Sequence, residues 1–236
     1  MRRFWKDVAV VAEAGGHGIA LDGKPVRTPG RAPLVAPNRP LAEAIADEWR
    51  GVGDTLDPRA MPLTGLANAA IDRIAPAPEG FAAGLSAYAA SDLLCYRADA
   101  PEPLVARQRA AWDPLLDWAR TRYDVHFALA EGVMPKPQPA ATLARIAEAV
   151  AALDPWRLAA LSPVVTVSGS VVAALALAEG AATPGQVWAA GQVDEDWQAE
   201  QWGEDTLATQ ARESRRRDFD AGARLLALLG RGADAG

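Results

Sequence analysis

The stretch LAALSPVVTVSGSVVAALALA, residues 158–178, contains no charged side chain. It is long enough to cross a bilayer. Six polar or helix-breaking residues interrupt it, however, and much of the remainder is alanine. These six are Ser162, Pro163, Thr166, Ser168, Gly169 and Ser170. Alanine contributes little transfer free energy compared with leucine. We therefore expect a buried helix inside a helical bundle rather than a transmembrane span.

Helical patterns continue on both sides of this stretch. Asp154 followed by Pro155 is typical of a helix start, because aspartate caps well and proline suits the first turn. Thr183 and Gln186 have the spacing of a capping box, in which each side chain bonds the other's backbone amide. Residues 104–123 and 140–153 place apolar side chains at helical spacing. The chain beyond about residue 78 is thus predicted to be almost wholly helical, with about six helices.

The first ~35 residues have a different pattern, that of short strands and tight turns. Val8 to Val11 is an apolar run rich in β-branched valine, and a glycine turn at residues 15–18 follows it. Asp22-Gly23 is a dipeptide favoured in hairpins that need a positive φ. Two helices are then predicted: one from about Pro40, capped by Asn38, and one over residues 61–74.

The sequence predicts an α+β protein built from two domains. Ala75 to Pro78 alternates alanine and proline and is typical of a stiff linker. We expect a β-rich N-terminal domain over residues 1–75 and a larger helical domain over residues 79–230. Residues 231–236 are predicted to form a flexible tail.

Composition excludes several classes of protein. The 236 residues are 50% apolar and 23% charged, as in a globular protein with a substantial core. A net charge of −6 argues against nucleic-acid binding, which needs a basic face. Cys95 is the only cysteine, so an intramolecular disulfide is impossible. The first residues lack the apolar core of a signal peptide, and we expect a bacterial cytoplasmic protein without membrane insertion.

Catalytic motifs are scarce. Nucleophilic catalysis by serine needs a base, usually histidine, and His17 and His126 are the only histidines. Neither Ser168 nor Ser170 has a glycine two residues before it, as a nucleophile elbow requires. Packed serines at a helix break are the simpler interpretation.

Cofactor motifs are equally scarce. Gly23-Lys24 is followed by proline within a predicted hairpin, which does not match a phosphate-binding loop. No cluster of histidine, aspartate and glutamate shows metal-ligand spacing. The sequence therefore predicts a protein that binds no cofactor, metal or nucleotide and is not an enzyme.

Tryptophan is unusually frequent, with eight residues against seven for phenylalanine and tyrosine together. Tryptophan is enriched at interface hot spots, although a core position is the simpler interpretation for any single one. Trp188, Glu195 and Trp202 lie seven residues apart, which places them on one face of a continuous helix. A carboxylate between two indoles indicates either an internal salt bridge or a surface for a basic client. Periodicity alone leaves both open.

Segments spread over nearly the whole chain resemble one family in order. They are Phe4-Trp5-Lys6, Leu21 to Pro29, Glu48-Trp49, Met61 to Thr64, Ser91 to Ala98, Gln108, Trp112 to Leu115, Ser168 to Ser170, Asp194 to Gln198 and Gln201 to Gly203. The family is that of the mitochondrial and bacterial chaperones for assembly of the ATP synthase catalytic head, the "ATP twelve" group.

The resemblance implies a small β-rich domain followed by a helical one. It also implies binding of the free α subunit of ATP synthase, which is kept from aggregating before the head closes. The resemblance implies that an acidic residue in the segment matching Asp194 to Gln198 matters in the mitochondrial members. By position we carry that role onto Glu195, with Asp194 and Asp196 as near alternatives. Gln198, Trp188 and Trp202 complete the expected client-binding set.

One departure and two alternatives remain. Residues 204–207 differ from the eukaryotic members, so contacts there can differ, and a bacterial member can have other clients. The first alternative is a small-molecule enzyme that uses the acidic segment around Glu195, and the second is a purely structural interaction module. A carboxylate cluster in a deep pocket would favour the enzyme. An apolar groove lined by tryptophan would favour the chaperone.

Overall fold

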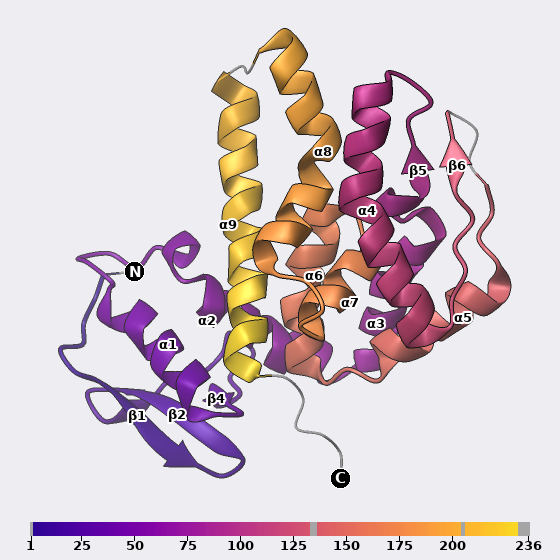
Figure 1. The fold of residues 1–236 in the computed structure, drawn as a ribbon. Coiled ribbons are helices and arrows are strands. Elements are labelled where there is room, and N and C mark those ends of the chain that lie inside the picture. The colour runs from indigo at the N-terminus through magenta and orange to yellow at the C-terminus, as the bar shows by residue number, and fades with distance from the viewer. Residues whose placement is uncertain (1, 133–135, 204–205, 231–236) are drawn as a thin grey trace.

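The protein has an α+β fold with a small strand region at the N-terminus and a larger helical part after it (Figure 1). The computed structural model describes residues 2–132, 136–203 and 206–230. The predicted tail at 231–236 lies outside these residues. The sheet and the first helix lie at one end of the molecule, beside the C-terminal half of the last helix (Figure 1).

The N-terminal sheet is built on one hairpin. Strands β1 (Val8–Glu13) and β2 (Gly16–Leu21) pair antiparallel, from Val8 opposite Leu21 to Glu13 opposite Gly16. The short strands β3 (Lys24–Pro25) and β4 (Val35–Ala36) also pair with β2. Between β2 and β3, Asp22 and Gly23 have φ values of 48° and 75°. These left-handed conformations confirm the predicted turn.

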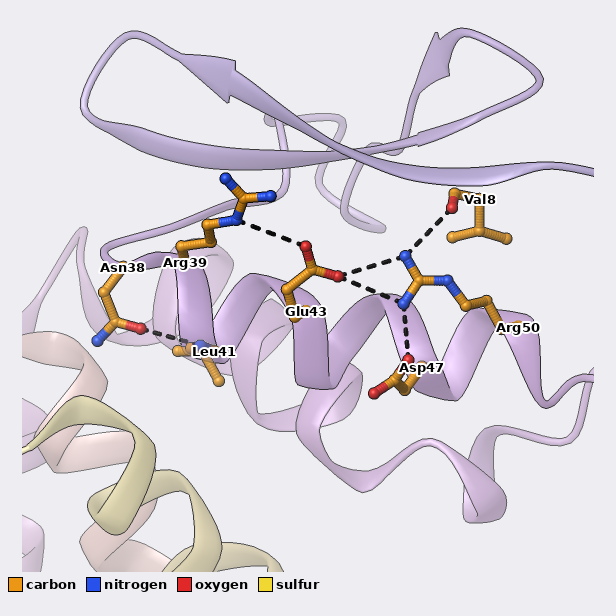
Figure 2. Close-up of polar contacts among 7 residues, drawn as sticks. All are labelled: Val8, Asn38, Arg39, Leu41, Glu43, Asp47 and Arg50. Carbon is orange, nitrogen blue, oxygen red and sulfur yellow. Dashed lines mark hydrogen bonds and ion pairs between the residues drawn. The ribbon is translucent and has the colours of Figure 1, made fainter.

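Helix α1 (Arg39–Arg50) covers the sheet and begins where the sequence predicted, since the Asn38 side chain accepts a 2.9 Å hydrogen bond from the Leu41 amide. Arg50 ties the end of α1 to the sheet (Figure 2): its Nη2 donates to the Val8 carbonyl at 3.3 Å. The same guanidinium pairs with Glu43 and Asp47 on its own helix. The buried side of α1 then carries the core residues Leu41, Ile45 and Trp49.

The predicted helix at 61–74 forms in two parts. After the short turn η1 (Pro58–Ala60), α2 (Pro62–Ala69) is followed without a break by the π-helical turn η2 (Ala70–Ile74). Glu48 accepts hydrogen bonds from the amides of Leu63 and Thr64, both at 2.8 Å, and so caps α2. At the expected linker the chain makes a short turn and α3 begins at Pro78. Buried apolar residues of both halves form one continuous cluster.

The helical part contains seven α-helices among the described residues, against about six predicted. They are α3 (Pro78–Ser86), α4 (Glu102–Tyr123), α5 (Ala140–Ala151), α6 (Pro155–Ser168), α7 (Val171–Ala178), α8 (Pro184–Trp202) and α9 (Thr206–Leu229). The 3-10 turns η3 (Ala87–Ser91) and η4 (Leu93–Cys95) follow α3. A parallel pair of two-residue strands, β5 (Tyr96–Arg97) and β6 (Ala130–Glu131), lies within this part and was not predicted.

The uncharged stretch at 158–178 forms most of α6 and all of α7, which are buried at the centre of the helical part. Gly169, with a φ of 68°, separates the two helices. None of the described helices has the length and apolar character that crossing a bilayer requires. The predicted starts of α6 at Asp154 and of α8 at Thr183 are confirmed, the second as a complete capping box.

Asp92 joins two helix starts inside the core. It is fully buried and accepts 3.1 Å hydrogen bonds from the amides of Leu94 in η4 and Val172 in α7. Burial raises the pKa of this carboxyl to about 6. The nearby serines are structural: Ser168 Oγ donates to the Val164 carbonyl at 2.7 Å, and Ser170 Oγ caps α7. The interpretation of both as packed serines is confirmed.

Helix α9 runs past both parts of the molecule. Its C-terminal half packs along α6 and also touches α1 and α2. Gly222 allows the close approach, because a Cβ there would lie 2.5 Å from the Ala160 carbonyl oxygen. Near the end of α9, Asn38 Nδ2 donates to the Leu228 carbonyl at 3.0 Å. One helix therefore connects the N-terminal region to the far end of the helical part.

Candidate functional site

Helices α8 and α9 form an antiparallel hairpin, with α8 lying between α9 and α4 (Figure 1). We call residues 194–202 and 206–216 the distal end of the hairpin. Glu204 and Asp205 in the connection lie outside the described residues. Because α8 is continuous from Pro184 to Trp202, the predicted stripe of Trp188, Glu195 and Trp202 does lie on one side of a single helix. That side faces α9.

The lower part of the hairpin is packed. Trp188 contacts Phe219 of α9, with ring centroids 5.5 Å apart, and Phe219 is fully buried. The Arg216 guanidinium lies 4.8 Å from the Trp188 ring centroid. Trp188 is thus a half-buried anchor that fixes α9 against α8.

Every carboxylate of α8 has a partner within the chain. The pairs are Asp194 with Gln108 at 2.8 Å, Glu195 with Arg215 at 2.5 Å, Asp196 with Arg212 at 2.6 Å and Glu200 with Arg107 at 2.7 Å. Glu195 therefore has the internal salt bridge that periodicity left open. Its side chain is still 49% exposed and that of Arg215 39%, so water reaches the pair.

A cleft of about 360 Å³ separates the two helices at the distal end. Glu195, Gln198 and Trp202 line it from α8, while Arg212 and Arg215 line it from α9. Ala199, Ala208 and Ala211 lie at the same level. Alanines are too small to fill the space between the helices, which explains why the cleft is there.

Two large apolar side chains stand at the mouth of the hairpin. Trp202 ends α8 and is 79% exposed, and Leu207 begins α9 and is 77% exposed. They are two of the four large apolar side chains that are exposed among the described residues, and apolar side chains gathered at one surface mark interaction sites.

The opposite flank of α8 faces α4. Asp194, Trp197 and Gln198 line a shallow hollow of about 330 Å³ there. Arg107 of α4 lies 5.0 Å from the Trp197 ring centroid. Gln198 borders both hollows, so the distal part of α8 is a ridge between them.

The structure brings Glu195, Gln198 and Trp202 together at the cleft. Asp196 lies beside them through its pair with Arg212, whereas Asp194 points toward α4 and Trp188 lies lower in the hairpin. Sequence reasoning missed Leu207, whereas it offered the run Arg212 to Arg217 as the source of an internal partner for Glu195, and Arg215 is that partner. The run of arginines at 212–217 was a signal, but only the pairing of α8 with α9 shows which acid each one binds.

Comparison with known proteins places the chain in a family. The sequence model described as ATP12 chaperone protein matches residues 2–120. The chain belongs to the ATP12 chaperone family. This family serves ATP synthase assembly, and the resemblance found in the sequence is confirmed.

Solved structures of ATP12 proteins share the fold over nearly the whole chain. The crystal structure of Atp12 from Paracoccus denitrificans is 44% identical with a TM-score of 0.91, covering 96% of this chain and 97% of that one. A mutant of the P. denitrificans protein with lysine in place of one aspartate also has a TM-score of 0.91, at 43% identity and the same coverage. The mitochondrial protein atp12 of Schizosaccharomyces pombe is 25% identical over 214 residues, which are 86% of this chain and 74% of that protein.

Proposed function

We propose that this ATP12 chaperone binds the free α subunit of ATP synthase and prevents its aggregation. The distal end of the α8–α9 hairpin is the contact surface in this proposal. Glu195 and Trp202 are at its centre, and Asp194, Asp196, Gln198 and Trp188 surround or support them.

One observation carries the proposal: Trp202 lines the open cleft and is exposed, and Leu207, next in sequence to the lining residue Ala208, is exposed as well. Removing a large apolar side chain from water stabilises a complex by about 2 kcal/mol. Tryptophan is also the residue most enriched at binding hot spots. A chaperone that covers the apolar surface of an unassembled subunit needs apolar contacts of this kind.

The acids supply the polar part of the contact. A salt bridge as exposed as that of Glu195 with Arg215 contributes at most about 1 kcal/mol to stability. A cationic client side chain can therefore replace Arg215 at little cost, and Arg215 is then released for a client acid. Because Glu195 already pairs with Arg215, client binding would exchange one cationic partner of Glu195 for another.

The test reverses the charge at Glu195. Glu195→Lys removes one exposed ion pair, so we expect the melting temperature to fall by no more than about 2–4 °C. Loss of the contact and added repulsion cost about 2–5 kcal/mol of binding, or about 30-fold or more in affinity. Suppression of α-subunit aggregation and the melting temperature are measured together.

Glu148→Lys is the matched control, because Glu148 is exposed on α5, away from the hairpin. The control should protect the α subunit as wild type does. A large fall in the melting temperature of Glu195→Lys would show that Glu195 stabilises the fold. Unchanged protection at unchanged stability would place the client contact elsewhere.

We also propose that the protein has no catalytic activity of its own. The four acids of α8 are bound to arginine or glutamine instead of to each other, so none of them forms the carboxylate pair of a general acid and base. Among the described residues, no three metal-ligating side chains come together. This arrangement disfavours the enzyme alternative around Glu195.

The division into residues 1–75 and 79–230 is likewise a proposal. The strand region and α1 have their own hairpin, cap and ion pairs, which supports the division, although α2 and η2 share one apolar core with α6 and α9. In this view residues 1–75 support the base of α9, and residues 79–230 contact the client.

A further inference from the structure

A second hollow lies next to the distal cleft along α9, and Thr209 and Arg212 line both. It has a volume of about 470 Å³ and is lined by Trp188, Thr209, Arg212, Glu213, Arg216 and Arg217. We call it the arginine groove. Three of its six lining residues are arginines, whereas the protein as a whole has a net charge of −6. Arg212 pairs with Asp196 and Arg216 with Asp220, so Arg217 is the lining arginine that no described acid binds.

Arg216 is held in a fixed orientation within this groove. Its guanidinium lies over the Trp188 ring, 4.8 Å from the centroid, and its Nε donates to both carboxylate oxygens of Asp220 at 2.8 Å. Nη1 and Nη2 of Arg216 make no hydrogen bond to any described residue. A planar guanidinium fixed at one edge presents its remaining donors as a fork, the geometry that matches a carboxylate.

Arg217 adds a second charge. It is exposed and has no ion pair or hydrogen bond with the described residues. Glu213 is the one acid among the lining residues, and Asp196 and Asp220 pair with two of the arginines from outside the lining. Among the described residues, the donors left without an acid are those of Arg217 and the Nη groups of Arg216. The face of the Trp188 ring lies beneath the Arg216 guanidinium, which makes the surface mixed rather than purely polar.

We propose that the arginine groove binds an acidic segment of the client protein. A client carboxylate occupies the fork of Arg216 with support from Arg217, and an apolar neighbour of that acid packs at Trp188. The inference rests on the proposed function and adds a second, oppositely charged contact to it. The hairpin then offers acids and an exposed tryptophan at the distal cleft, and arginines in the neighbouring groove.

A direct probe tests the groove without the client. A short labelled peptide of alternating leucine and glutamate is titrated by fluorescence anisotropy, with its leucine–glutamine counterpart for comparison. We expect binding of the glutamate peptide only, weakened about tenfold by Arg217→Glu and by Arg216→Gln. Arg217→Glu removes no intramolecular bond, so its fold stays intact even if Arg216→Gln loosens α9. Arg109→Glu, an exposed arginine of α4, should bind within about twofold of wild type.

The α subunit is the second probe. Aggregation of the α subunit should be suppressed less by Arg217→Glu than by Arg109→Glu. Equal protection by these two variants, or equal binding of the two peptides, would contradict the proposal that the groove binds an acidic segment. Failure of the wild-type protein to protect the α subunit contradicts the proposed function instead. The peptide titration then decides by itself whether the groove takes acidic segments.

Discussion

Asp92 is the buried carboxyl in the structure whose proton uptake should be visible in the stability of the whole protein. Its oxygens face amide donors of η4 and α7, with burial as the main reason for the raised pKa of about 6. The unfolded chain has the ordinary aspartate pKa near 3.9. The folded state thus holds this proton more tightly than the unfolded state does.

The sign of the pH effect follows from that difference. The contribution of Asp92 to the free energy of unfolding is fully present below about pH 4 and is lost as the pH rises through about 6. Asp92→Asn cannot ionise and should remove this decline. Urea unfolding midpoints measured from pH 4 to pH 7 compare the two proteins. An identical decline in both would assign the effect to other groups.

The Glu195–Arg215 pair permits a second test at the residue scale. Glu195→Arg combined with Arg215→Glu restores an ion pair with its direction reversed, so the stability should return to within about 0.5 kcal/mol of wild type. Client protection should stay low, because the acid no longer projects from α8. Thermal melts and α-subunit aggregation assays give the two readings. Restored protection in the double variant would show that the pair matters only for the fold.

Helix starts and turns are the elements that the sequence predicted best. Asn38, Asp154 and Thr183 each cap a helix as expected, since capping depends on side chains within three residues of the amides they bind. The turn at Asp22-Gly23 is local in the same way. Caps and turns of this kind can therefore be predicted from the neighbouring residues without knowing the rest of the fold.

Contacts between elements were harder to predict. The spacing of Trp188, Glu195 and Trp202 gave their shared face, but not that α9 lies opposite it with Arg215 in reach. The two-residue strands β5 and β6 are stabilised by their place in the fold, and no pattern of length two can predict that. The sequence could therefore name candidate residues on α8, and their role stays a prediction, whereas the cleft depends on how alanines of α8 and α9 face each other.

The exposed pair at the hairpin mouth gives a prediction at the scale of the element. Trp202→Ala with Leu207→Ala removes side chains that are mostly in water, so the stability should change by less than about 0.5 kcal/mol. Binding of the α subunit should weaken by about 30-fold or more. Chemical unfolding and calorimetric titration measure the two effects.

Trp112→Ala is the opposite case. Trp112 is fully buried and its Nε1 donates to the Ala190 carbonyl at 2.8 Å, so truncation should cost about 3–5 kcal/mol of stability. If the double variant at the mouth bound the α subunit normally, the apolar contact would have to lie on another surface.

For the whole molecule we predict that ATP does not bind. Gly23-Lys24 lies in an exposed hairpin turn, followed by Pro25 in a strand instead of a helix start that could hold phosphates. Isothermal titration with MgATP should give no heat of binding at micromolar protein. A measurable affinity would revive the enzyme alternative.

The position of helix α9 determines how the protein should respond to proteolysis. Its C-terminal half completes the core with α6 and α1, and its N-terminal half carries one wall of the proposed client contact. A protease that cuts near Phe219 would sever the wall and open the core in the same event. Limited digestion should therefore yield intact protein and small peptides. We expect no fragment that stays folded but no longer binds the client. One cleavage would then abolish both the folded structure and the binding of the client.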